Sequence, residues 1–266
     1  MIGSRSCVVR RGLGTLALIV AYGLPAHAQP PSVSDTADRP GFADSPVLLG
    51  RGHIQVESGV AWEHEGSSAD LTKTLTWPQL ELHVGLAPRL EVSLAWDGLV
   101  SSVSNPQGRN TGGADLRLGA KFDLVNRPGV NAALIGYVEL PVGSDSVSSG
   151  YADPLARFAW GISLSDGVGV SGTADLGAAR EADGRVRPKP AVSASLGATL
   201  VRNLNGFVGI VAESPAAGSR PDVWSVEGGV VLPLGVRTQI DVWASRRLAG
   251  GPDDWFFGAG IVRRVR

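Results

Sequence analysis

From about Ile54 to its last residues, the chain repeats short stretches in which apolar and polar residues alternate. In one of them, Leu118 and Phe122 alternate with the charged residues Arg117 and Lys121. Because successive side chains of a strand point to opposite faces, this pattern predicts strands with one apolar face and one charged face. Such strands are typical of a β-barrel with lipid outside and water inside.

Twelve such stretches predict twelve strands, and bacterial single-chain barrels have an even number of strands. The predicted strands lie near residues 53–63, 72–86, 89–98, 113–124, 130–140, 154–164, 168–177, 189–200, 206–213, 222–232, 236–244 and 255–264. The apolar sets of the third, sixth, eighth and eleventh strands are expected to face outward. They are Leu90, Val92, Leu94, Trp96, Phe158, Trp160, Ile162, Leu164, Val192, Ala194, Leu196, Leu200, Val236, Ile240 and Val242.

The second predicted strand changes its phase in the middle. Leu75 and Trp77 are odd-numbered, whereas Leu80 and Leu82 are even-numbered, and Pro78 lies at the change. A bulge adds one residue to a strand and so shifts the alternation by one. We therefore expect a β-bulge at Pro78 that keeps the apolar set on one face.

The connections between the predicted strands alternate in length. Short turns such as 86–89 and 165–167 take turns with longer polar segments such as 99–112 and 141–153. Outer-membrane barrels have short periplasmic turns and longer external loops. The pattern predicts an all-β, antiparallel, up-and-down transmembrane β-barrel of about 12 strands. A soluble β-sandwich is the alternative, but a sandwich has no reason to alternate long and short connections.

The first residues resemble a secretory signal peptide. Arg5, Arg10 and Arg11 precede a short apolar run at 13–24, and Ala26-His27-Ala28 fits a cleavage site. We expect residues 1–28 to be a signal peptide cleaved after Ala28 and residues 53–266 to be a barrel in the bacterial outer membrane of a Gram-negative cell. Residues 29–52, rich in Pro and Gly, are expected to form an extended lead-in to the barrel mouth or along its periplasmic rim.

Composition excludes several classes of protein. The formal charge of −1 becomes −4 without the signal peptide, with 21 basic against 25 acidic residues, so nothing indicates a nucleic-acid partner. The only cysteine, Cys7, lies in the signal peptide, which leaves no disulfide or thiolate metal site. The mature part has no apolar run of 18 residues, which excludes helical membrane spans.

The charged residues opposite the apolar sets are the candidates for a lumen lining, because a charge facing lipid costs about 2–4 kcal/mol near the midplane. They are Glu57, Glu81, Glu91, Asp115, Arg117, Lys121, Asp123, Glu139, Arg157, Asp175, Glu227, Arg237 and Asp241. Two functions remain open. The lining can wet a channel for small solutes, or its acids and bases can pair inside a plugged barrel that serves a structural or partner-binding role.

No motif indicates an enzyme or a cofactor. Residues 167–172 spell G-x-G-x-x-G, but no helix is expected to follow, so they predict a barrel strand rather than a dinucleotide site. Neither G-x-S-x-G nor H-E-x-x-H is present. A barrel-type lipid hydrolase needs a His paired with a Ser nucleophile, and His53, His64 and His83 give no spacing for catalysis or for metal binding.

Several stretches between residues 38 and 144 resemble one family. Asp38-Arg39-Pro40-Gly41-Phe42-Ala43-Asp44-Ser45-Pro46 and Gly52-His53-Ile54-Gln55-Val56-Glu57 are similar to the first motif of the outer-membrane barrel family named for the MetA pathway of phenol degradation. Residues 85–92, 113–121 and 140–144 resemble its later hairpin and strand motifs.

The resemblance implies an outer-membrane barrel that passes small solutes, including apolar or aromatic compounds, and that meets membrane lipid and the barrel assembly machinery. The chain departs from such barrels at its end. They usually finish on an aromatic residue that the assembly machinery reads, whereas this chain finishes on Val265 and Arg266.

Overall fold

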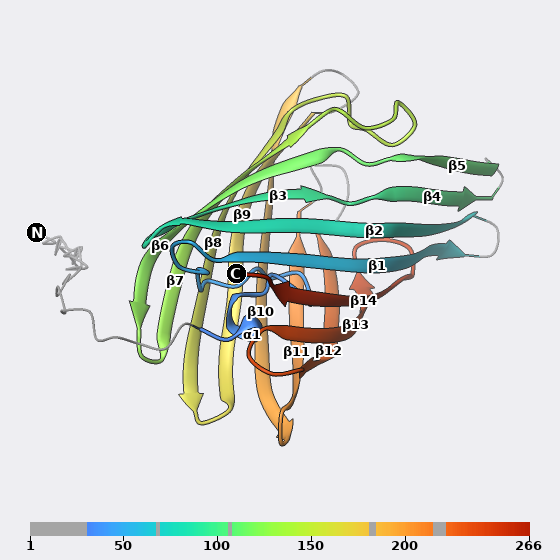
Figure 1. Cartoon of the computed structure of the whole chain (residues 1–266). Helices are drawn as coiled ribbons and strands as arrows, with labels where there is room; N and C mark the ends of the chain where they lie inside the picture. The colour runs from blue at the N-terminus through green and yellow to red at the C-terminus, as the bar shows by residue number, and fades with distance from the viewer. Residues whose placement is uncertain (1–30, 68–69, 106–107, 181–184, 215–221) are drawn as a thin grey trace, which may run out of the picture.

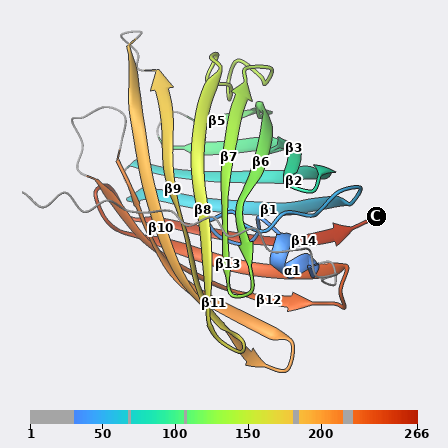
Figure 2. The same cartoon turned by 90° about the vertical axis from the view of Figure 1, so that its left-hand side faces the viewer.

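The computed structural model describes residues 31–67, 70–105, 108–180, 185–214 and 222–266. These residues form one antiparallel sheet of 14 strands, which closes on itself because β1 pairs with both β14 and β2. Figures 1 and 2 show the strands curving around a lumen. Twelve strands make the closed wall, and β4 and β5 branch from the outer part of β2. The predicted twelve-strand barrel is confirmed.

The elements follow one another along the chain in up-and-down order. Their bounds are α1 Val33–Thr36, β1 Ile54–Ser67, β2 Asp70–Ala87, β3 Leu90–Trp96, β4 Leu99–Ser104, β5 Gly108–Gly113, β6 Leu116–Arg127, β7 Val130–Leu140, β8 Asp153–Ser165, β9 Val168–Arg180, β10 Val186–Val201, β11 Leu204–Glu213, β12 Val223–Pro233, β13 Thr238–Ala249 and β14 Asp254–Arg264. Each predicted strand overlaps one wall strand.

The outward face of the wall is apolar, as the alternation predicts. Phe122 on β6 is 45% exposed and Leu196 on β10 is 46% exposed, and both are among the large hydrophobic side chains that face away from the lumen. The same face also carries Leu94, Phe158, Ile162 and Ile240. Their contiguity around the whole barrel is suited to lipid and not to water, because monomeric soluble proteins rarely expose large continuous apolar surfaces.

The bulge predicted in β2 is present. In the pairing of β1 with β2, Gly59 lies opposite Gln79 and Ala61 lies opposite Thr76. One residue of β1 therefore faces the two residues Trp77 and Pro78 of β2, which is one extra residue in β2. As a result Trp77 and Leu80, which differ in parity, are both exposed on the outer face.

The two ends of the barrel differ, and we name them by their connections. At the short-turn end, two-residue links such as 128–129 and 166–167 join the strands. At the long-loop end the strands run further than predicted, because residues 64–67, 178–180 and 245–249 extend β1, β9 and β13. Parts of the predicted loops, namely 68–69, 106–107, 181–184 and 215–221, lie outside the described residues.

Residues 99–112, predicted as a long polar connection, do connect two wall strands, β3 and β6, but they contain the two extra strands β4 and β5. Their Ser- and Gly-rich sequence has a weak strand pattern. β2 is 18 residues long, and β3 pairs only with residues 80–87 in its C-terminal half. Residues 72–77 of β2 therefore offer free backbone groups, which pair with β4. The far edge of β5 is covered in turn by the 141–152 loop, where Asn110 Nδ2 donates to Ser146 O at 2.6 Å.

The N-terminal segment, residues 31–52, enters the barrel at the short-turn end and lies inside the lumen, drawn in blue in Figure 1. Its only helix, α1, has four residues, and Val33 packs against Val262 of β14 with both side chains fully buried. Among the described residues no helix is long and apolar enough to cross a membrane. The predicted signal peptide, 1–28, lies outside the described residues.

The last residues continue the pairing of β14 with β1. Val265 N donates to Ile54 O at 2.9 Å, and Ile54 N donates to Arg266 O at 3.0 Å. Val265 is exposed on the outer face. Arg264 points inward instead, where its Nη2 donates to Thr36 Oγ1 of α1 at 2.7 Å.

Candidate functional site: a lumen occupied by the N-terminal segment

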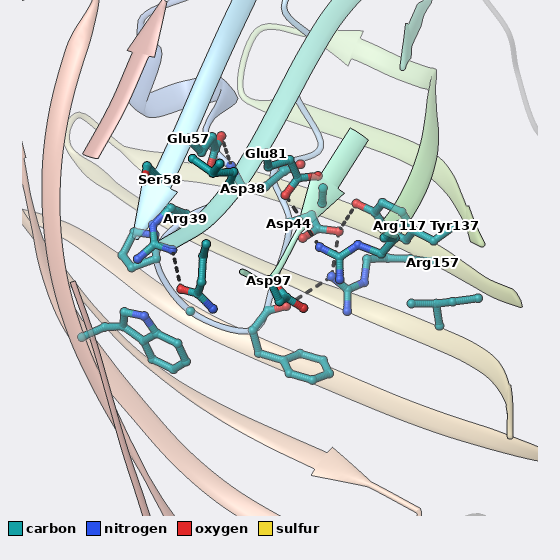
Figure 3. A pocket seen from close by; sticks show the side chains of 18 of the residues that line it. Asp38, Arg39, Asp44, Glu57, Ser58, Glu81, Asp97, Arg117, Tyr137 and Arg157 are labelled. Atoms are coloured by element: carbon teal, nitrogen blue, oxygen red, sulfur yellow. Dashed lines mark hydrogen bonds and ion pairs between the residues drawn. The ribbon is translucent and has the colours of Figure 1, made fainter. Parts of the chain in front are cut away.

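Three side chains of the N-terminal segment, Asp38, Arg39 and Asp44, each form an ion pair with a charged side chain of the wall. Figure 3 shows them pointing from the segment toward the surrounding strands. The sequence places them in a turn-rich stretch without secondary structure, so their backbone is free to follow the lumen. The wall supplies opposite charges from strands that are distant in the sequence.

Asp38 lies deepest and is held by Lys121 of β6. Lys121 Nζ donates to Asp38 Oδ1 at 2.8 Å and to Oδ2 at 3.0 Å, and both side chains are 4% exposed. The backbone N–H of Asp38 donates to Glu57 Oε1 of β1 at 3.0 Å. Burial raises the pKa of the Asp38 carboxyl to about 6, although the ammonium of Lys121 opposes that rise.

Asp44 pairs with Arg157 of β8. Its Oδ2 lies 2.7 Å from Arg157 Nη1 and accepts a hydrogen bond from the Tyr137 hydroxyl at 2.7 Å. Burial alone would raise the pKa of Asp44, but Arg157, Lys121 and the Tyr137 hydroxyl hold it below the ordinary value. Arg157 also forms a bidentate pair with Asp175 of the neighbouring strand β9, at 2.9 and 2.5 Å.

Arg39 fits between two glycines that face each other across the β1–β14 pairing, Gly59 and Gly260. A Cβ on either residue would meet the guanidinium of Arg39, so the glycines leave the space that this side chain fills. Arg39 Nη2 lies 3.4 Å from Asp241 Oδ1 of β13, and Nη1 donates to Gln79 Oε1 at 3.3 Å.

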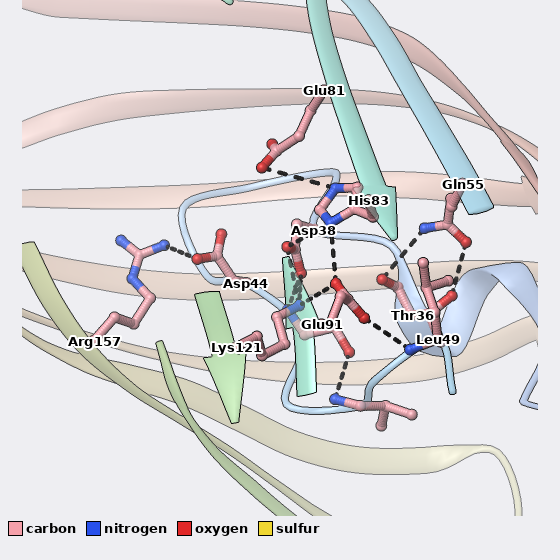
Figure 4. A network of polar contacts seen from close by, with 12 residues as sticks. Thr36, Asp38, Asp44, Leu49, Gln55, Glu81, His83, Glu91, Lys121 and Arg157 are labelled. Atoms are coloured by element: carbon pink, nitrogen blue, oxygen red, sulfur yellow. Dashed lines mark hydrogen bonds and ion pairs between the residues drawn. The ribbon is translucent and has the colours of Figure 1, made fainter. Parts of the chain in front are cut away.

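A network of hydrogen bonds fixes the rest of the segment, as Figure 4 shows around Glu91. Leu49 N donates to Glu91 Oε2 at 2.8 Å. Phe42 N donates to Glu227 Oε2 at 3.0 Å, and the Phe42 ring lies 5.1 Å from the Arg157 guanidinium. Backbone N–H groups of the segment thus donate to carboxylates of the wall, in addition to the ion pairs of its side chains. Both kinds of contact hold the segment on its path through the lumen.

The structure brings six of the predicted lumen residues into contact with the N-terminal segment. They are Glu57, Glu91, Lys121, Arg157, Glu227 and Asp241. Glu81, Arg117 and Asp175 lie beside them: Arg117 Nη2 is 3.7 Å from Glu81 Oε2, and Asp175 pairs with Arg157. Glu139 is partly buried and opposite Arg117 in the β6–β7 register.

The remaining three predicted residues lie at the ends of the barrel. Asp115 holds the 141–152 loop, since its carboxylate accepts from Gly143 N at 2.8 Å and from Ser148 Oγ at 3.0 Å. Asp123 lies 3.7 Å from the exposed Arg89 near the short turns. The placement of Arg237 in a strand is wrong. It is exposed in the turn between β12 and β13, because β12 ends at Pro233 and β13 begins only at Thr238.

Sequence reasoning missed the partners that the segment itself provides, namely Asp38, Arg39, Phe42 and Asp44. Three of them carry a charge, but they lie in a stretch predicted only as an extended lead-in, and nothing in that pattern indicates a partner. It also missed the uncharged lumen residues Gln55, Gln79 and Gln239. They face inward at the same parity as the charged residues, so the strand alternation could have found them.

Two cavities lie on either side of the segment. One, of about 330 Å³, opens toward the long-loop end and is lined by Arg39, Glu81, Arg117, Trp243 and Phe256 among others. The other, of about 450 Å³, lies toward the short-turn end between the segment and β7 to β12. Asp44 borders both cavities. The lumen is therefore divided at the Asp44–Arg157 pair.

Comparisons with known proteins show the family of this chain and its neighbours in fold. The model of the family described as "Putative MetA-pathway of phenol degradation" matches residues 37–265. An outer-membrane channel from Pseudomonas putida F1 is 17% identical, with a TM-score of 0.64 over 82% of this chain and 97% of that chain. The NanC porin is 6% identical, with a TM-score of 0.51 over 80% and 100% of the two chains.

The β-domain of the Bordetella autotransporter BrkA is 13% identical, with a TM-score of 0.51 over 80% of this chain and 99% of that one. At such low identities these likenesses concern the fold. No curated protein sequence matches the chain significantly.

Proposed function

We propose that this protein is a narrow outer-membrane channel for small solutes. The chain belongs to the family described as "Putative MetA-pathway of phenol degradation", and the proposal starts from that membership. The observation that carries this proposal is the divided lumen. Two cavities, of about 330 and 450 Å³, meet at Asp44, so a local shift of the N-terminal segment joins them into one path.

The cavity toward the long-loop end suits a small solute with both apolar and polar parts. Phe42, Leu155, Trp243 and Phe256 give apolar and aromatic surface, while Arg117 gives a hydrogen-bond donor. A compound with a ring and a hydroxyl group would satisfy both kinds of lining. The family description names phenol degradation, and together with this cavity lining it supports small aromatic compounds as one class of solute.

The cellular setting belongs to the same proposal. Residues 1–28 act as a signal peptide cleaved after Ala28 in a Gram-negative cell, and the barrel assembly machinery inserts the barrel. Outer-membrane lipid then covers the apolar outer face, which includes Phe122 and Leu196. The long-loop end faces the exterior and the short-turn end faces the periplasm. Recovery of the protein in the soluble periplasmic fraction would contradict this setting.

A second candidate function is a plugged barrel with a structural or partner-binding role. The favouring observation is that each charged side chain in the middle of the segment is paired, Asp38 with Lys121, Arg39 with Asp241 and Asp44 with Arg157. Such pairing accounts for the lumen charges without any transport. No enzymatic role is proposed, because the neighbours in fold are an outer-membrane channel, a porin and the β-domain of an autotransporter.

The substitution Asp44→Ala separates the two candidates. It removes the carboxylate between the cavities, while Arg157 keeps Asp175 as its partner, so no buried charge is left unpaired. We expect wild-type protein in liposomes to admit phenol and other small solutes slowly, and the variant to admit them several-fold faster with larger single-channel steps in planar bilayers. The exposed carboxylate Asp253, changed to Asn, provides the control and should leave both readings at the wild-type level.

Folding of each variant is checked by heat-modifiable migration on gels. If folded wild-type and Asp44→Ala proteins both show no conductance steps and their liposomes exclude every small solute, the channel proposal fails and the plugged barrel remains.

A further inference from the structure

His83 of β2 lies at the centre of a buried group of carboxylates, close to the point where the N-terminal segment meets the wall (Figure 4). The residue is 1% exposed. Its Nδ1 lies 3.0 Å from Glu91 Oε1, and the other Glu91 oxygen accepts from Leu49 N. Because an ionised Glu91 is an acceptor only, Nδ1 carries the hydrogen, and in a neutral imidazole the lone pair is then on Nε2.

The Nε2 atom faces two further carboxylates. Glu57 Oε1 is 3.5 Å away and Glu81 Oε1 is 3.8 Å away. In the described part of the chain, His83 Nε2, Glu81 Oε1 and Glu57 Oε2 are buried and have no hydrogen-bond partner. Two of these buried atoms without a partner, His83 Nε2 and Glu81 Oε1, therefore lie 3.8 Å apart, and a cation placed between them would satisfy the lone pairs of both.

The group holds more acidic than basic side chains. Four carboxylates, Asp38, Glu57, Glu81 and Glu91, lie within 4 Å of His83. Two cations lie within 4 Å of these carboxylates, Lys121 beside Asp38 and Glu91 and Arg117 beside Glu81. A metal binds only deprotonated ligands, and with four carboxylates and a neutral imidazole the group has room for the two positive charges of one divalent cation.

We propose that this group is a binding site for one divalent transition-metal cation such as Zn²⁺, held by His83 Nε2 and the carboxylates of Glu81 and Asp38. One nitrogen of His83 and one carboxylate oxygen from each of the other two residues lie within 4.8 Å of one another. Glu81 Oε1 is 3.8 Å from Nε2 and Asp38 Oδ2 is 3.9 Å from Nδ1, so the Asp38 carboxylate turns toward Nε2 on binding. Zinc bonds of about 2.0–2.2 Å put tetrahedral ligands about 3.4 Å apart, so the side chains close in by about 1 Å on binding. One imidazole with carboxylates is a ligand set that suits Zn²⁺.

Histidines that bind a metal through one nitrogen commonly donate a hydrogen bond from the other nitrogen to a carboxylate. Glu91 is that carboxylate here, since it accepts from His83 Nδ1 and so orients Nε2 toward the metal. Glu57 lies next to the site, with Oε1 3.5 Å from His83 Nε2. The cavity of about 330 Å³ reaches Asp38, Glu57 and Glu81, and it gives a cation access from the long-loop end.

The site joins two parts of the molecule. Asp38 belongs to the N-terminal segment, whereas His83 and Glu81 belong to β2 of the wall. A bound cation therefore ties the segment to the barrel and makes its release less favourable by mass action. This consequence holds for a channel and for a plugged barrel alike, so the site does not depend on the proposed transport function.

The test uses the purified, folded full chain, stripped with a chelator and titrated with ZnCl₂ by calorimetry, with the bound metal counted by elemental analysis. We expect one Zn²⁺ per chain, and an affinity at least 10-fold weaker in His83→Gln and in Glu81→Gln. The controls are Asp253→Asn, an exposed carboxylate at the rim, and His64→Gln, whose ring stacks on Trp62 away from the group; both should keep the wild-type affinity. Heat-modifiable migration confirms that each variant is folded.

Glu91→Gln tests the outer carboxylate by two readings. We expect weaker Zn²⁺ binding with unchanged heat-modifiable migration, and partial recovery of affinity in Glu91→Asp, which restores the negative charge.

A separate reading follows the segment itself. Trypsin cleavage after the exposed Arg51 should slow several-fold when Zn²⁺ is added to wild-type protein and should not change in His83→Gln. The proposal is overturned if wild-type protein binds no Zn²⁺ in the micromolar range, as expected for a protonated His83 that pairs with the carboxylates itself. It is equally overturned if His83→Gln binds Zn²⁺ as tightly as wild type.

Discussion

Ion pairs inside the lumen and ion pairs at the long-loop rim use the same kinds of side chain in different surroundings. Lys121 and its partners Asp38 and Glu91 are at most 4% exposed. At the rim, Arg246 lies 3.3 Å from Asp253, and about half of each side chain is exposed, 49% and 54%. Water screens the two charges of the rim pair. In the lumen group, each buried charge is compensated only by the side chains paired with it. The comparison indicates that burial, and not the number of ion pairs, makes the lumen charges structurally important.

The largest expected effect is the loss of the buried cation. Lys121→Met leaves Asp38 and Glu91 close together without their shared ammonium, and we expect about 3–5 kcal/mol of lost stability because an uncompensated charge stays buried. Denaturant unfolding in detergent measures it. The rim variant Arg246→Met is the matched control and should cost about 0–1 kcal/mol.

The pair Asp38→Asn with Lys121→Met should recover part of the loss, since the double variant removes both charges. Equal losses for Lys121→Met and Arg246→Met would break the distinction between lumen and rim.

A smaller effect is expected where the wall makes room for the segment. In Gly260→Ala, the new Cβ meets the guanidinium of Arg39 and pushes it away from Asp241. Forced repacking of this kind costs about 1–3 kcal/mol. The same substitution at Gly136, whose Cβ would meet nothing within 4 Å, is the control. Unfolding midpoints measure the effect, and identical midpoints of the two variants would show that Arg39 does not need this space.

The smallest effect is expected at Asp115, which holds the 141–152 loop outside the lumen. Slight burial acts to raise the pKa of Asp115, but the hydrogen bonds from Ser148, Gly143 and Ser149 outweigh it and lower the pKa. A lowered pKa means that the ionised form stabilises the loop above the ordinary pKa of an aspartate, and that this contribution is lost only as the pH falls through the lowered value.

Asp115→Asn should therefore speed chymotrypsin cleavage after Tyr151 a few-fold at pH 7 and leave the free energy of unfolding within about 0.5 kcal/mol. Wild-type cleavage, corrected for the pH dependence of the enzyme, should not change between pH 7 and pH 5. Faster cleavage of the wild type at pH 5 would contradict the sign of this pKa shift.

Strands and their faces were predictable because their cause is local. The twelve wall strands, the outward apolar sets and the bulge at Pro78 all follow from alternation along the chain. The hairpin of β4 and β5 was not predictable, because its Ser- and Gly-rich sequence becomes strand only where β2 offers a free edge. The candidate site was predictable in part: Glu57, Lys121 and Arg157 followed from parity, whereas their partners in the N-terminal segment did not.

The sequence alone determined a closed, two-faced barrel, since the strand period of two is a property of the backbone and acts over a few residues. Only the tertiary structure decided what fills the barrel. Asp38 meets Lys121 from 83 positions away and Arg39 meets Asp241 from 202 positions away. Burial and charge in three dimensions bring such partners together. The alternation of residues along the chain does not show which distant residues come into contact. The convergence of His83, Glu81 and Asp38 has the same origin.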